Sequence, residues 1–132
     1  MKTIPDLEGQ HTAMLDVLQQ ERLALLGGDI GAARSLLDRL HLLQQDHIAH
    51  EEAELIPRLP PLARWPAKVY LAEHSKLGAM LAELRTSLAP LPAQVSDAST
   101  RLALIDAHMP FKHVLEHHFE REEKGLFVEV HG

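Results

Sequence analysis

The sequence of 132 residues contains no cysteine. This absence excludes a disulfide framework, thiolate ligation of zinc or iron–sulfur clusters, and thiol chemistry. Any metal that the chain binds must therefore be held by nitrogen and oxygen ligands. A chain of this length can bury a core without disulfides or a structural metal. We expect a single domain over residues 1–132, in which a metal would serve function rather than folding.

The sequence also lacks long apolar runs and any concentration of positive charge. No stretch approaches the roughly 18–20 apolar residues of a membrane span, and residues 1–6 do not resemble the start of a signal peptide. Thirteen basic and 19 acidic residues give a formal net charge of −6. Without a basic stripe, nucleic-acid binding is disfavoured. We expect a soluble, cytoplasmic protein that binds neither membranes nor nucleic acids.

Aromatic residues are scarce, whereas histidine is abundant. The chain has one Trp, one Tyr and three Phe, but ten His. A hydrophobic core does not require so many imidazoles, so their positions along the chain decide what they do.

The apolar residues recur every three or four positions and nowhere alternate, which predicts helices throughout. We predict four helices, over residues 5–26, 29–56, 66–88 and 97–128. Gly27-Gly28 should end the first helix, Pro57 the second, and Pro110 should kink the fourth. Helices of this length with short connections are typical of an all-α, up-down-up-down antiparallel four-helix bundle.

Two of the predicted helices share a motif, His-x-x-x-Glu-Glu-x-x-Leu. It begins at His47 in the second helix and recurs 71 residues later at His118 in the fourth. Residues four apart lie on one side of a helix, so Glu51 and Glu122 each accompany a histidine. The first and third helices each place one histidine, His11 and His74, on a leucine-rich face. All four helices thus direct potential ligands toward one axis.

A carboxylate on a buried face must be paired or must bind a cation. No Lys or Arg lies on the inner faces near Glu51 or Glu122. Taken singly, a lone histidine is usually a core residue bonded to a carbonyl, and a His-x-x-x-Glu pair is usually solvated. Those readings do not hold jointly for four imidazoles and two acids. Such a donor set suits two divalent or trivalent ions, with iron the leading choice.

Other sites are weaker alternatives. Zinc prefers four ligands around one ion, and a ferritin-like site needs Glu-x-x-His, the reverse of the order found here.

The remaining polar side chains have lesser roles. His50 and His117 point partly off the axis, and His108 is too far along its helix to reach the same metal. We expect surface positions for His41, His113 and His131. Solvation, or hydrogen bonding to ligand imidazoles, is expected for Glu52, Glu54 and Glu123.

These motifs, in this order, resemble the hemerythrin-like family, also called the HHE cation-binding domain, over essentially the whole chain. The resemblance implies that His11 and His47 bind one iron, and that His74 and His118 bind the other. It also implies that Glu51 and Glu122 bridge the two irons together with an oxo or hydroxo group.

The sequence departs from oxygen-carrying hemerythrin after His74. There, a second histidine follows four residues later, whereas this chain has Gly78. The second bridging acid is Glu rather than Asp. We predict room for solvent or a small ligand beside the second iron at Gly78. Tyr70, one turn before His74, is expected to be a core aromatic or a hydrogen-bond or electron donor at the site.

The resemblance implies a di-iron protein that binds or senses O2 or NO. An enzyme that reduces NO or decomposes peroxide with electrons from an unidentified donor is a second interpretation. A third is an iron-sensing or iron-buffering module whose occupancy controls helix packing. The missing fifth imidazole favours sensing or detoxification over oxygen transport.

Overall fold

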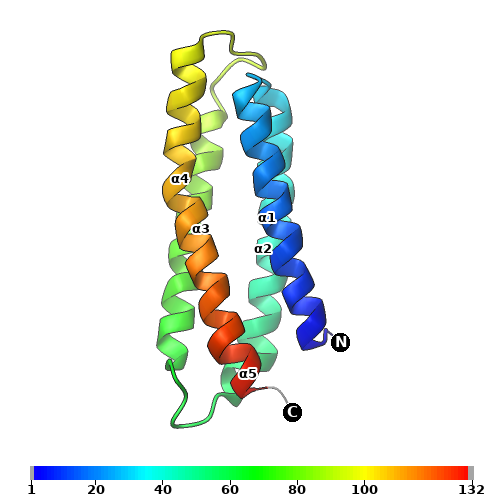
Figure 1. The fold of residues 1–132 in the computed structure, drawn as a ribbon, viewed down its shortest axis with the longest axis vertical. Coiled ribbons are helices and arrows are strands. Elements are labelled where there is room, and N and C mark those ends of the chain that lie inside the picture. Colours follow the sequence, from blue (N-terminus) through cyan, green and yellow to red (C-terminus); the bar gives the residue numbers. More distant parts are fainter. Residues whose placement is uncertain (1, 131–132) are drawn as a thin grey trace.

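The computed structural model describes residues 2–130, in which four long helices run antiparallel as a bundle (Figure 1). They are α1 (Ile4–Leu26), α2 (Ile30–His50), α3 (Ala67–Leu88) and α4 (Ala98–Arg121). One hairpin consists of α1 and α2, and a second consists of α3 and α4 (Figure 1). The predicted all-α four-helix bundle is confirmed.

Side chains at the helix starts satisfy backbone amides that have no partner within the helix. Thr3 and Asp6 form a capping box at α1. Asp29 accepts a hydrogen bond from the Ala32 amide, and Asp97 accepts one from the Thr100 amide. The predicted starts of the second and fourth helices therefore agree with the structure within a residue.

The predicted ends of the second and fourth helices are wrong in one respect. Regular α-helix stops at His50 and at Arg121, and each is followed by a π-helical turn, η1 (Glu51–Leu55) and η3 (Glu122–Leu126). A short 3-10 turn that contains Pro57, η2 (Ile56–Arg58), follows η1, and α5 (Phe127–Glu129) follows η3. A π turn inserts one residue into a helix, and the spacing of apolar residues does not reveal so small a change.

The two hairpins meet at the end of the bundle that is distant from the chain termini. Gly28 has a φ of 75° there, which favours glycine, and a Cβ at this position would collide with the Val95 carbonyl. The Val95 amide donates to the Gly28 carbonyl at 2.9 Å, and the Ile30 amide donates to the Ala93 carbonyl at 2.9 Å. The α3–α4 connection is thereby fastened to the α1–α2 turn.

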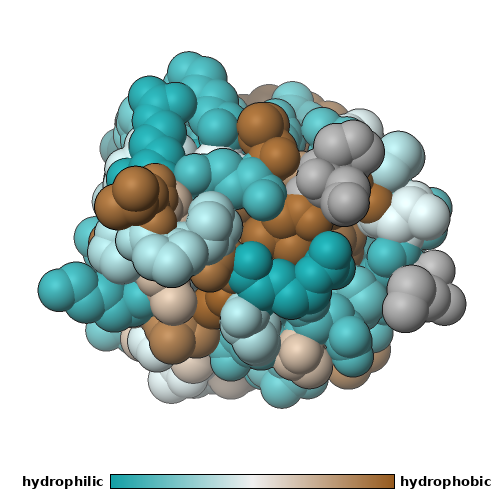
Figure 2. Space-filling model, turned by 90° about the horizontal axis from the view of Figure 1, so that it is seen from below, coloured by the Kyte–Doolittle hydropathy of each residue, from teal (hydrophilic) through white to brown (hydrophobic). Residues whose placement is uncertain are grey.

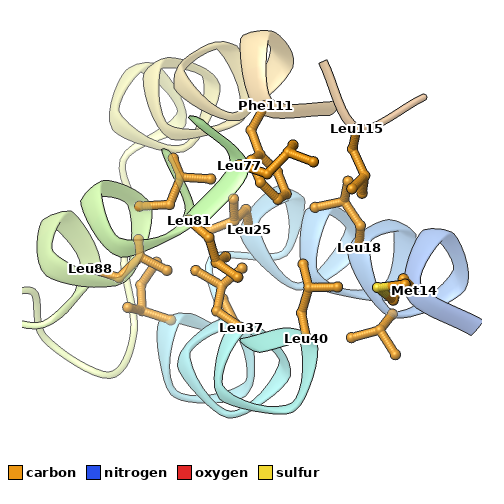
Figure 3. Close-up of a cluster of buried hydrophobic side chains, with 14 of the residues drawn as sticks. Met14, Leu18, Leu25, Leu37, Leu40, Leu77, Leu81, Leu88, Phe111 and Leu115 are labelled. Atoms are coloured by element: carbon orange, nitrogen blue, oxygen red, sulfur yellow. The ribbon is translucent and has the colours of Figure 1, made fainter. Parts of the chain in front are cut away.

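The larger apolar core fills this distant half of the bundle. Its buried side chains point toward one another from all four helices (Figure 3). Full burial of each leucine stabilises the fold by about 1.5–3 kcal/mol. Leu37 is buried where the sequence pattern favoured Leu36, which is partly buried. Pro110 lies inside α4, and the kink expected there stays a prediction.

A second, smaller apolar cluster lies at the end that carries the chain termini. It comprises Leu7, Leu55, Ile56, Tyr70, Leu126, Phe127 and Val130. Figure 2 views this end and shows hydrophobic atoms in the middle of a mainly hydrophilic surface. On α1, α2 and α3 the predicted ligands lie between the smaller cluster and the larger one, and on α4 Phe119 of the larger cluster follows His118 directly. On α1, for example, His11 follows Leu7 and precedes Met14. The fold therefore holds a polar layer between two apolar ones.

No helix in the described part of the chain combines the length and the apolarity needed to cross a membrane.

Candidate metal centre

The structure brings all six predicted ligands together in the polar layer. Their side chains are at most 4% exposed, and both glutamates are completely buried. They form two groups whose donor atoms lie within 4.8 Å of one another. One group is His11, His47, Glu51 and Glu122, and the other is Glu51, His74, His118 and Glu122. Each group takes two imidazoles from one hairpin, and both groups share the two carboxylates.

The separations within each group match those expected of ligands that share one ion. His47 Nε2 lies 3.0 Å from Glu51 Oε2, and His118 Nε2 lies 2.9 Å from Glu122 Oε2. Two donor atoms that are each ~2.1 Å from one ion stand about 3 Å apart. Glu51 Oε2 is buried yet makes no properly aligned hydrogen bond. A carboxylate oxygen left in this state is costly, and a cation would satisfy it.

A π turn begins at each of the two carboxylates. Each turn begins at a glutamate, Glu51 or Glu122, one helical turn after His47 or His118. The imidazole and the carboxylate therefore face the same side. Short π turns inside helices are frequent at functional sites.

Each of the four imidazoles is oriented by an oxygen on its outer side. Nδ1–H of His11 donates to Glu123 at 2.8 Å, and that of His74 donates to Glu52 at 2.8 Å. His118 Nδ1–H donates to Glu73 at 2.7 Å. Because these Nδ1 atoms carry the protons, the Nε2 lone pairs face the centre of the bundle.

The fourth imidazole, His47, is oriented by a neutral amide. Its Nδ1–H donates to Gln10 Oε1 at 2.7 Å. The Gln10 amide nitrogen donates to Asp46 at 3.0 Å, which fixes the amide oxygen toward His47. Lys2 in turn pairs with Asp46 at 2.9 Å. His47 therefore has the same tautomer as the other three, without a carboxylate partner.

Without a metal, protons occupy the centre. Burial alone would lower the pKa of His47, but hydrogen bonds to Glu122 and Glu51 outweigh it and raise the pKa to about 9. The same balance raises the pKa of His74 to about 10. For His118, burial is outweighed by the charge of Glu122 and its hydrogen bond, and the pKa rises to about 9.

The two buried carboxylates are driven apart in pKa. Burial and the charge of Glu122 raise the pKa of Glu51. Burial would also raise the pKa of Glu122, but hydrogen bonds from Glu51, His118 and His11 hold it well below its usual range. Glu51 therefore keeps its proton to higher pH than Glu122 does. A metal ion that binds here must displace these protons from its ligands, so metal affinity depends on pH.

Aromatic rings close the centre on the side of the first hairpin. The His11 ring stacks on Phe119 with centroids 3.8 Å apart, and Phe127 lies 5.2 Å away on centroids. These rings exclude water from the His11 side and lower the local dielectric constant, which strengthens interactions between charged ligands and a cation.

Tyr70, Gly78 and His50 were predicted to lie near the centre without being ligands, and the structure places them in different surroundings. Tyr70 is completely buried in the smaller apolar cluster, and burial raises its pKa to about 12. Gly78 is exposed, and a Cβ there would meet no atom within 4 Å. The ligand vacancy beside the second iron stays a prediction. His50 is half-buried, and within residues 2–130 it makes no hydrogen bond to the six central side chains.

Sequence reasoning identified two of the four outer partners, Glu52 and Glu123. It missed Gln10 and Glu73, which directly precede His11 and His74 but hydrogen-bond to histidines of other helices. Arg121 holds Glu73 in place at 2.8 Å. A signal was available for Glu73, since it is an acid next to a proposed ligand.

A second buried polar pair lies outside the centre. Glu21 of α1 and His108 of α4 are both completely buried, with His108 Nε2 2.9 Å from Glu21 Oε2. The two groups are close enough to pair as charges, but they are not aligned as a hydrogen bond. His108 Nδ1–H donates to the Leu104 carbonyl at 2.7 Å. His108 was predicted to be separate from the metal site, and its pairing with Glu21 was not predicted. Of the predicted surface histidines, His113 is exposed, His41 is partly exposed, and His131 lies outside the described residues.

Comparison with known proteins gives one match. The family model for the hemerythrin HHE cation-binding domain matches residues 2–130. Neither the comparison with curated proteins nor that with solved structures gave a significant match.

Proposed function

Because the chain belongs to the hemerythrin HHE cation-binding domain family, we propose that it binds a pair of iron ions and uses the pair to bind or sense O2 or NO. His11, His47, His74 and His118 supply the imidazoles, and Glu51 and Glu122 bridge the ions together with an oxo or hydroxo group. When bound, the pair supplies electrons and coordination positions for a diatomic ligand.

One observation carries this proposal. The Nε2 atoms of His11 and His47 lie only 3.1 Å apart, and both approach Glu122 Oε1, at 2.8 and 3.3 Å. Both rings use Nδ1–H for outer hydrogen bonds. In the neutral tautomers two lone pairs therefore face each other beside a carboxylate oxygen. These neutral rings are unfavourable together without a cation, so the metal-free centre takes up protons instead. A metal ion that displaces those protons satisfies the lone pairs and the carboxylate together.

The donor set supports iron in particular. Imidazole suits zinc, copper, iron and nickel, whereas carboxylate draws the preference toward harder ions. Four imidazoles with two carboxylates are intermediate, and two groups that share both acids favour two ions over one. The protein contributes to this site ligands of fixed orientation, a buried polar layer, and the Phe119 ring that stacks on His11.

The metal content of the purified protein tests the first part. We expect about two irons per chain in the wild-type protein, following the two donor groups. Glu51→Ala and Glu122→Ala should lose most of this iron. Glu54→Ala is the control, because Glu54 is exposed in the same π turn as Glu51. Iron-free wild-type protein, or both acid variants retaining iron, would refute the site.

Mixing the anaerobically reduced protein with O2 or NO tests the second part. We expect a long-lived change in the near-ultraviolet and visible spectrum that reverses when the gas is removed. Immediate conversion to a stable diferric spectrum, with turnover of added NO or peroxide, would instead assign the centre to a redox enzyme and overturn the binding proposal.

A further inference from the structure

The outer hydrogen bonds follow the internal symmetry of the two hairpins, with one exception. The residue after each bridging glutamate supports the single histidine of a neighbouring helix: Glu52 supports His74, and Glu123 supports His11. The residue before His11 and the residue before His74 each accept a hydrogen bond from the other histidine of the same hairpin, His47 or His118. At this second position the first hairpin has Gln10 and the second has Glu73.

The consequence is an unequal environment for the two ions. Both imidazoles of the His74–His118 group donate to carboxylates, at 2.8 and 2.7 Å. In the His11–His47 group, one donates to the carboxylate of Glu123 and the other to the amide of Gln10, at 2.8 and 2.7 Å. The hydrogen-bond distances are equal in the two groups, so the bonds differ in the charge of one acceptor and not in length.

A carboxylate behind a ligand imidazole makes that ligand more basic. More basic ligands stabilise the more highly charged state of the metal. We propose that the ion held by His74 and His118 is oxidised first, so that the half-oxidised centre carries Fe(III) there and Fe(II) between His11 and His47. The inference rests on the proposed iron pair and adds the order in which its two ions are oxidised.

The surrounding charges modify this difference without reversing it. Arg121 pairs with the second oxygen of Glu73 at 2.8 Å, which weakens but does not remove the negative charge behind His118. Behind His47, Gln10 is neutral, and the Asp46 beyond it is paired with Lys2. Phe119 against His11 adds no charge. The second hairpin therefore keeps the greater negative charge next to its imidazoles.

Stepwise oxidation of the reduced iron-loaded protein with ferricyanide tests the proposal. Each ferricyanide accepts one electron, and the first converts Fe(II)Fe(II) to Fe(II)Fe(III). Electron paramagnetic resonance measures the mixed-valent state, because its coupled pair has half-integer spin. The measured quantity is the equilibrium constant for forming two mixed-valent centres from one reduced and one oxidised centre.

Substitutions that make the same change of charge behind the two ions should change this equilibrium constant in opposite directions. Gln10→Glu and Glu73→Gln each remove the inequality, so each should lower this constant. We expect a change of about tenfold, the lower end of the effect that outer-shell substitutions have on metal affinity. The double variant Gln10→Glu/Glu73→Gln exchanges the two environments and should restore it. Glu52→Gln should lower the constant and Glu123→Gln should raise it, because these two act on opposite ions.

Two results would overturn the inference. One is an unchanged constant in both Gln10→Glu and Glu73→Gln. The other is a change of the same sign in Glu52→Gln and Glu123→Gln, which would indicate a purely structural effect. Wild-type protein that holds no iron would refute the proposed function instead, so the two failures are distinguishable. Glu120→Gln, an exposed acid on α4, should leave the constant unchanged.

The zinc-loaded protein gives a readout without redox chemistry. In its proton and nitrogen NMR spectrum, three ligand Nδ1–H signals should be shifted downfield by charged acceptors, and that of His47 should stand apart. Gln10→Glu should move the His47 signal to join the other three. Four equivalent signals in the wild-type protein would contradict the inequality.

Discussion

Two glycine-to-alanine substitutions should have opposite effects on stability. Gly125 is buried in η3, and a Cβ there would lie within 3 Å of Tyr70 Oη and of two Trp65 ring atoms. Gly78 is exposed in α3, and a Cβ there would meet nothing within 4 Å. Neither glycine has a positive φ, so backbone strain does not contribute to the comparison.

The magnitudes follow from packing and helix propensity. Alanine is favoured over glycine in a helix by about 1 kcal/mol, and Gly78→Ala should gain up to this amount. In Gly125→Ala the same gain is opposed by an overpacking cost of about 1–3 kcal/mol, because Tyr70 is completely buried and cannot move away freely. We expect a net loss of up to about 2 kcal/mol. The melting temperatures of the two variants should differ by roughly 10 °C.

Thermal unfolding followed by circular dichroism, with a chelator present to remove metal binding, measures this difference. Adding Tyr70→Phe to Gly125→Ala removes the nearest atom and should recover part of the loss. A Gly125→Ala variant that melts at or above the wild-type temperature would refute the packing of Tyr70 and Trp65 over η3. A loss in Gly78→Ala would refute the open position in α3.

Three further predictions concern the buried polar groups. Glu122→Gln, which keeps the shape of a side chain shared by both donor groups, should lose iron measured by elemental analysis, whereas Glu120→Gln on the exposed side of α4 should not. Glu21→Leu should lower the free energy of unfolding by about 1–3 kcal/mol, because it leaves His108 unpaired. Its iron content should not change, because ten residues of α1 separate Glu21 from His11 by about 15 Å. Denaturant titrations measure the loss, and adding His108→Leu should recover part of it. Three central imidazoles have pKa values raised from 6.5 to about 9–10, so their stabilising protonation is complete below pH 6.5 and is lost as pH rises through 9–10. Metal-free protein should therefore have a lower denaturation midpoint at pH 10 than at pH 7, and the iron-loaded protein, whose imidazoles are already deprotonated, should lack this loss.

The sequence predicted the features that depend on position along a single helix. Apolar spacing placed the four helices, and the cost of burying Glu51 and Glu122 without a cation indicated the centre. The structure brings all six predicted side chains into that layer.

Features that depend on how helices face one another were not predictable in this way. Gln10 supports His47, although its neighbour in sequence is His11. This contact requires the rotation of α1 against α2, which periodicity does not specify. The π turns at Glu51 and Glu122 each insert a single residue, which changes the spacing of apolar residues too little to be recognised in the sequence. Glu21 was detectable, because it lies between Leu18 and Leu25 on the buried face of α1.

The division of ligands between the hairpins links assembly of the bundle to the acquisition of metal. Each donor group takes both imidazoles from one hairpin but one of its carboxylates from the other. A hairpin alone can thus offer an ion two imidazoles and a single acid, and only docking of the second hairpin supplies the remaining acid. Under the proposed function, the complete set of ligands for either ion exists only while the two hairpins are docked, and separation of the hairpins would remove a carboxylate from both donor groups at once.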